Sequence, residues 1–336
     1  MSREKFIDVA KGIGITLVVL GHLNAHDQVI RNIIYAFHMP FFFIVSGVFV
    51  NTQIGFKQYL IKNFRRTYCP FLFFSLIEII LKLLYDILRN LELVALIPNS
   101  IYSLSGLKFT IINRPLWFLF VLFVIQVVYY LIEKSKTLKI GMLFLGLAIV
   151  MGSKYVHYPK NCLWIVAIPC LSFYIIGNIF KKCILSLPRR IKNHTVKYLV
   201  ISFFLIGIFI LCAIKNECVD MSSCNYGNWL MYILSAFMGT FILLIVSVML
   251  SEKRNISNVL TFLGENSIVI LVSHYYLCRI FFPRLMIYLG LQQYIYSYVT
   301  QLILLTIIVG LMIPIILFSN KYGGFVFGRK KHICKK

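Results

Sequence analysis

The chain alternates long apolar runs with short polar connections. A helix that crosses a bilayer needs about 20 mostly apolar residues, and the runs in this chain are close to that length. The pattern therefore predicts an all-α, polytopic membrane protein with about ten transmembrane helices. The expected spans are residues 6–24, 33–50, 68–88, 114–132, 138–153, 162–180, 197–214, 229–250, 267–282 and 297–318.

Two parts of this pattern are less regular. The longest connection, residues 89–113, holds a single Pro and several Ser and Asn, so we expect a loop there and not a domain. The ninth run is short, and we expect its helix to end at Pro283 because proline disrupts helix interiors. No internal repeat and no low-complexity tract interrupts the series.

The composition agrees with a membrane location. The chain has 336 residues, of which 60% are hydrophobic and 13% charged, whereas soluble proteins carry about 25% charged residues. Mean hydropathy is +0.85. The first apolar run contains Asp8 and Lys11 and has no small-residue cleavage site, so we interpret it as a retained spanning helix and not as a signal peptide.

The formal charge of +23 has two readings. Nucleic-acid binding needs a basic face on a soluble surface, but here the charges lie between apolar runs, so we expect no nucleic-acid partner. Basic residues concentrate in cytoplasmic loops of membrane proteins. With a cytoplasmic N-terminus, 23 Lys and Arg fall inside and 9 outside. We therefore expect both termini in the cytoplasm, in a multi-pass protein of the cytoplasmic (inner) cell membrane.

Polar groups inside the first span are the first candidates for function. A charged side chain at the bilayer centre costs about 3 kcal/mol on insertion scales. Lys11 and His22 are eleven residues apart, which puts them on one helix face with about 16 Å between them, and Asp8 lies one turn before Lys11. An interfacial Asp8–Lys11 pair with a structural His22 is the simpler interpretation, and a catalytic site is the other.

Two further histidines lie in expected spans. His38 precedes Pro40 at the start of the second span, at a depth comparable to that of His22, and His274 lies in the ninth span. A single intramembrane histidine is more often a hydrogen-bonded structural group. Several on separate helices favour a shared polar site.

The connection after the second span carries Lys62, Arg65 and Arg66. These cations can anchor the protein to anionic lipid heads. Alternatively, they can hold phosphates, because guanidinium groups pair with phosphate oxygens through two hydrogen bonds. Further on, Arg114 and Trp117 fall at the expected outer boundary, where an interfacial anchor explains Trp117.

The nine cysteines are mostly single and lie in apolar runs, where they serve as small hydrophobic residues. Cys218 and Cys224 differ because they share one polar loop. That loop is expected outside the membrane, where a disulfide between them is possible. No CxxC motif or Cys/His cluster indicates a metal, and we expect no bound cofactor.

Five motifs in fixed order resemble the acyltransferase family 3 membrane proteins, which include bacterial O-antigen and capsule O-acetyltransferases. They are DVAKGIGITLVVLGH, FHMPFFFIVSG, KNFRRTYCPF, PLWFL and LGENSIVILVSH. Many members have Arg where this chain has Lys11. Residues 140–255 match by hydropathy alone. The resemblance implies one acyltransferase-type transmembrane domain over residues 1–336, with no soluble domain.

The resemblance also implies a reaction and a set of roles. The reaction is transfer of an acyl group from cytoplasmic acyl-CoA, with acetyl-CoA the expected donor, to a sugar hydroxyl of a surface polysaccharide or its lipid-linked precursor. His22 is the expected base, and Lys11 is a possible donor to the developing oxyanion. The residues with implied roles are His22, Lys11, His38 and Asp8 in catalysis, Lys62, Arg65 and Arg66 at the CoA phosphates, and Arg114, Trp117, Ser46 and His274 as further site candidates.

Transport is the alternative function. Intramembrane Asp, Lys and His residues also mark proton relays in carriers, so a polysaccharide or small-molecule transporter or flippase remains open at this point. Carriers often contain inverted repeats, and no such repeat is detectable in this sequence.

Overall fold

The computed structural model describes residues 4–23, 27–88, 96–156, 158–159, 161–295 and 297–328. Helices make up 82% of the structure, and the described residues contain no β-strand. An isolated antiparallel bridge joins Asp220 and Asn225. The all-α prediction is confirmed.

Seventeen α-helices, two π-helical turns and four 3-10 turns follow one another along the described part of the chain. Their bounds are α1 Lys5–Leu23, α2 Gln28–Tyr35, α3 His38–Val48, α4 Phe56–Asn63, η1 Phe64–Tyr68, α5 Cys69–Leu88, α6 Leu96–Leu104, η2 Arg114–Leu116, α7 Trp117–Ile132, α8 Lys136–Gly152, α9 Leu163–Ile179, α10 Lys181–Leu185, α11 Leu187–Asn193, α12 Thr195–Lys215, η3 Met221–Ser223, α13 Trp229–Ser251, α14 Arg254–Glu265, α15 Ser267–Tyr276, η4 Leu277–Phe281, α16 Phe282–Tyr288, η5 Gln292–Tyr294, α17 Tyr298–Tyr322 and η6 Gly323–Phe325.

Seven helical segments of the described chain are long and apolar enough to cross a membrane. They coincide with seven of the expected spans, so the chain is a multi-pass membrane protein. The segments are Lys5–Leu23, Gln28–Val48, Arg114–Ile132, Thr195–Lys215, Trp229–Ser251, Ser267–Tyr288 and Tyr298–Phe325.

The other three expected spans also coincide with helices, α5, α8 and α9. Helix α5 carries three charged residues, Glu78, Lys82 and Asp86, and α8 and α9 have 17 residues each. The count of ten and the cytoplasmic placement of both termini stay predictions. Part of the charge that motivates that placement, Arg3, Arg89, Lys160 and the basic residues of 329–336, lies outside the described residues.

Two expected boundaries were wrong. Residues 89–113 are not all loop, because α6 forms within them and packs along α5. The ninth span does not end at Pro283 but continues to Tyr288. The π-helical turn η4 comes directly before α16, and Pro283 is the second residue of α16, in the first turn, where its missing N–H is tolerated.

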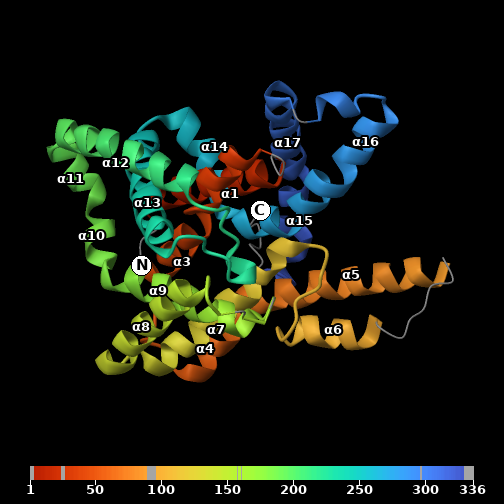
Figure 1. Ribbon diagram of the computed structural model, residues 1–336, viewed down its shortest axis with the longest axis horizontal. Helices are drawn as coiled ribbons and strands as arrows, with labels where there is room; N and C mark the ends of the chain where they lie inside the picture. The colour runs from red at the N-terminus through yellow and green to blue at the C-terminus, as the bar shows by residue number, and fades with distance from the viewer. Residues whose placement is uncertain are drawn as a thin grey trace, which may run out of the picture.

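Helix α1 lies at the centre of the bundle, against α3, α13, α14, α15 and α17 (Figure 1). Glycines let α1 and α14 touch backbone to backbone. A Cβ atom on Gly12 would lie 2.0 Å from the carbonyl oxygen of Leu260, and one on Gly264 would lie 1.9 Å from that of Asp8. Larger residues at either glycine would push the helices apart.

Burial on α5 is the reverse of that in a soluble helix. Ser75, Glu78 and Asp86 are buried, whereas Leu81 and Leu84 are exposed. Helices α5 and α6 lie side by side and project from the rest of the molecule (Figure 1). Polar groups turned inward and apolar groups turned outward are what a lipid environment requires, because hydrocarbon cannot satisfy hydrogen-bonding groups.

Candidate active site

Three helices bring the intramembrane histidines together. The ring centre of His22 on α1 lies 5.2 Å from that of His274 on α15. Tyr35 of α2 contacts both His22 and His38 of α3, with its ring centre 6.2 Å from that of His22 and 4.9 Å from that of His38. Tyr275 packs edge-on against His22 at 5.3 Å. The three histidines therefore form one cluster, in which His22 and His274 are direct neighbours.

Backbone hydrogen bonds fix two of these rings. His38 Nδ1 lies 2.8 Å from the carbonyl oxygen of Ile34, and His274 Nδ1 lies 2.8 Å from that of Ile270. A carbonyl oxygen only accepts, so Nδ1 is the donor in each ring and Nε2 of the neutral imidazole carries a lone pair. This Nε2 in His274 is buried and has no hydrogen-bond partner among the described residues. His274 Nε2 can therefore accept a hydrogen bond, and its ring is the direct neighbour of His22.

A buried carboxylate holds α15, the helix that carries His274. Glu78 of α5 accepts the N–H of Ile112, the N–H of Asn113 at 3.1 Å and the hydroxyl of Tyr276 at 2.7 Å. Asn113 Nδ2 in turn donates to the carbonyl of Val272 at 2.8 Å.

Val272 lies two residues before His274 and Tyr276 two residues after it, so these hydrogen bonds hold α15 just before and just after the position of His274 along the helix. We call the hydrogen bonds of Glu78 and Asn113 the α15 clamp. Glu78 was not a candidate from the sequence. The signal was present, because a carboxylate within an apolar run is costly unless it is paired.

Lys11 and Asp8 lie at the other end of the same α1 face. Lys11 Nζ is 3.5 Å from Asp8 Oδ1 and 5.3 Å from the ring centre of Phe49, three residues after the half-buried Ser46 on α3. Because α1 is one continuous helix, Lys11 and His22 are about 16 Å apart along its axis. They cannot both touch one reacting atom.

The remaining candidates lie in different settings. Arg114 is exposed, with Nη1 3.5 Å from Asn161 Oδ1. Trp117 is buried, and its ring centre lies 6.2 Å from that of Phe43. Neither residue has a described contact with the three histidines.

The basic connection forms an exposed strip. Lys62 ends α4, and Arg65 and Arg66 lie in the π-helical turn η1. All three are exposed, whereas Asn63 and Thr67 between and after them are buried. The segment thus turns its cations outward. It follows α3, which ends beside Lys11, so the strip and Lys11 belong to the same end of the bundle.

Cys218 and Cys224 are both free thiols in the structure, and a disulfide between them stays a prediction. Burial raises the pKa of Cys224 to about 11 and also raises the pKa of Cys218. Among the residues that the structure describes, no group of three His, Cys, Asp or Glu side chains is arranged to hold a metal ion.

Comparison with known proteins gives one match to a family model. The model, described as an acyltransferase domain of family 3, matches residues 4–319. This range contains all five motifs, the three histidines and the basic strip. Searches among curated proteins and among solved structures found no match.

Proposed function

We propose, from the premise that the chain belongs to the acyltransferase family 3 membrane proteins, that it transfers an acetyl group from cytoplasmic acetyl-CoA to a sugar hydroxyl. The acceptor in this proposal is a surface polysaccharide or its lipid-linked precursor, at the cytoplasmic membrane. Family membership favours acyl transfer over the transport function that the sequence alone left open.

The observation that carries the proposal is the contact between His22 and His274. At 5.2 Å between ring centres, the ring nitrogens can reach hydrogen-bond distance when they face each other. In the proposed arrangement the lone pair on His274 Nε2 accepts the N–H of His22. This bond fixes the tautomer of His22 and leaves its other nitrogen free to act as a base.

The proposed reaction then balances as follows. The acceptor hydroxyl oxygen bonds to the thioester carbonyl carbon while its proton passes to His22. The tetrahedral oxyanion collapses, the carbon–sulfur bond breaks, and the CoA thiolate takes the proton from the His22 imidazolium. The products are an acetyl ester and CoA. His274 stabilises the imidazolium because its lone pair faces the ring that carries the charge.

Donor binding falls to the other end of the bundle in this proposal. Lys62, Arg65 and Arg66 are exposed cations that can pair with CoA phosphates. Lys11, beside Asp8 and Phe49, then lies along the path of the donor and not at the oxyanion, because it is about 16 Å from His22.

The test uses membranes that contain the protein, supplied with radiolabelled acetyl-CoA. We expect base-labile ester label in the carbohydrate fraction, and release of CoA thiol that depends on the presence of that fraction. Membranes with His22→Gln at the same protein level are the control. Label that appears equally in the control membranes, or none above membranes without the protein, contradicts the proposal.

A further inference from the structure

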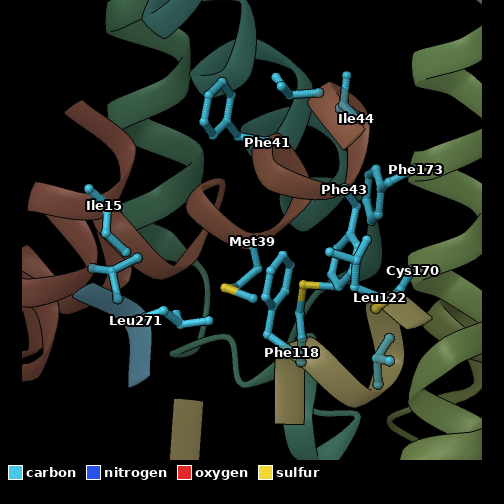
Figure 2. Packing of buried hydrophobic residues seen from close by; sticks show 14 of the residues in the cluster. Ile15, Met39, Phe41, Phe43, Ile44, Phe118, Leu122, Cys170, Phe173 and Leu271 are labelled. Carbon is cyan, nitrogen blue, oxygen red and sulfur yellow. The ribbon is translucent and has the colours of Figure 1, made fainter. Parts of the chain in front are cut away.

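A small apolar cavity lies among α1, α3, α7 and α15. Its volume is about 30 Å³, and its lining is apolar except for Ser267 and includes Ile15, Val18, Met39, Phe118 and Leu271. Figure 2 shows Ile15, Met39, Phe118 and Leu271 around this space. We call this space the acyl cavity.

The acyl cavity directly adjoins the histidine cluster. Val18 precedes His22 by one helical turn on α1, and Leu271 precedes His274 by one turn on α15. On α3, Met39 follows His38, and the chain then runs toward Phe49 beside Lys11. The cavity therefore lies about one helical turn from the imidazoles, toward the Lys11 end of α1.

The cavity also lies on the line from Lys11 to His22. Residues 11, 15, 18 and 22 of α1 form one stripe at helical spacing, and the two middle positions line the cavity. A thioester that enters from the Lys11 end reaches this space before it reaches His22. Its apolar lining suits a methyl group and not a charged or strongly polar one.

The size of the cavity limits what it holds. A cavity needs a volume of about 10–15 Å³ to hold one water molecule. A cavity of 30 Å³ therefore has room for about two heavy atoms, the number of carbons in an acetyl group. We propose that the acyl cavity binds the acyl group of the donor and restricts it to two carbons. This inference rests on the proposed acyl transfer from CoA. One methylene too many in an apolar pocket costs about 10–200-fold in kcat/KM.

Two adjacent valines provide a matched test. Val18 and Val19 are both buried on α1, but Val18 lines the cavity and Val19 does not line it. Val18→Ala and Val19→Ala remove the same atoms from the same helix. The measurement is the ratio of kcat/KM for acetyl-CoA to that for propionyl-CoA and butyryl-CoA, in reconstituted full-length protein.

We expect wild type to prefer acetyl-CoA, Val18→Ala to reduce that preference by at least about tenfold, and Val19→Ala to leave it within twofold. Ile15→Ala enlarges the cavity from one turn away and should act in the same direction, so it decides the question if Val18→Ala does not fold. Active enlarged variants with the wild-type ratio would overturn the inference.

A different failure separates the cavity from the proposed function. A wild-type preference for propionyl or longer groups overturns the two-carbon limit while leaving acyl transfer from CoA intact. If wild type uses none of the three donors although the protein is folded, the proposed donor itself is wrong, and the inference falls with it.

Discussion

At the scale of single residues, His22, His38 and His274 look alike in the sequence but differ in their surroundings. His22 and His274 are in direct ring contact, whereas the described ring contact of His38 is with Tyr35, which also contacts His22. His38 and His274 are each tied through Nδ1 to a backbone carbonyl one turn earlier. His274 is therefore the direct neighbour of His22, whereas the sequence alone did not distinguish His274 from His38.

This difference predicts an order of effects for three substitutions. We expect His22→Gln to reduce acetylation by about 10²–10⁴-fold, the usual cost of losing a general base. His274→Gln should cost less, because it removes a positioning group, and His38→Gln least. Initial rates are compared at equal protein level in the membrane. The assignment fails if His22→Gln keeps most of its activity while His38→Gln loses it.

Glu78 gives a second prediction at this scale. Glu78→Gln removes the charge that holds the N–H groups of residues 112 and 113 and the hydroxyl of Tyr276. Breaking a buried hydrogen-bonded group costs about 1–3 kcal/mol of stability. We expect kcat to fall, because the hydrogen bonds of Glu78 hold α15 near His274. KM for acetyl-CoA should stay constant, because Glu78 is not part of the basic strip.

Ser75→Ala is the control for Glu78→Gln. Ser75 is also buried on α5, but its hydroxyl has no hydrogen-bond partner among the described residues, so its loss should leave kcat unchanged. If Glu78→Gln also raises KM for acetyl-CoA, the substitution disturbs the whole fold, and the α15 clamp does not act specifically through His274.

At the scale of elements, the basic strip on α4 and η1 has two possible partners, lipid heads and CoA phosphates. Replacing Lys62, Arg65 and Arg66 together by Gln should raise KM for acetyl-CoA at least about tenfold and leave KM for the acceptor unchanged, because each lost phosphate contact is a charge-assisted hydrogen bond. Initial-rate kinetics with varied acetyl-CoA provide the measurement.

Helix α11 offers the matched variant for the strip. Arg189, Arg190 and Lys192 are also three exposed cations, in a connection expected on the same membrane side. Replacing them by Gln should not change KM for acetyl-CoA. Equal effects from the two triple variants would show that the strip contributes only general membrane electrostatics.

The apolar runs predicted the long helices, because the length of an apolar run is a local property of the sequence. The helices α1, α3 and α15, with their histidines, could therefore be predicted from the sequence. The α15 clamp could not be predicted, because Glu78 and Tyr276 are 198 residues apart, and Asn113 and Val272 are 159 residues apart. No local pattern encodes which distant helix meets which. Likewise, the continuation past Pro283 depends on a π-helical turn that the residue pattern does not reveal.

At the scale of the whole molecule, the excess of basic residues in alternate connections predicts that both termini face the cytoplasm. Cys183 tests one connection directly, since it is exposed in α10 between the expected sixth and seventh spans. A membrane-impermeant maleimide should label Cys183 only from the cytoplasmic side.

Reporter fusions at the C-terminus should agree with the labelling result. Cys224 should react slowly at neutral pH even when its side is open, because a thiol with a pKa of about 11 is almost entirely protonated there. Rapid labelling of Cys183 from outside would reverse the predicted orientation of this part of the chain.

We propose that this membrane acyltransferase uses His22 to place an acetyl group from acetyl-CoA on a sugar hydroxyl. The most direct measurement is ester-linked radiolabel in carbohydrate, formed from labelled acetyl-CoA by wild type and by His22→Gln at equal protein level in membranes. We expect label with wild type and a loss of about 10²–10⁴-fold with the variant. Undiminished label with His22→Gln would contradict it.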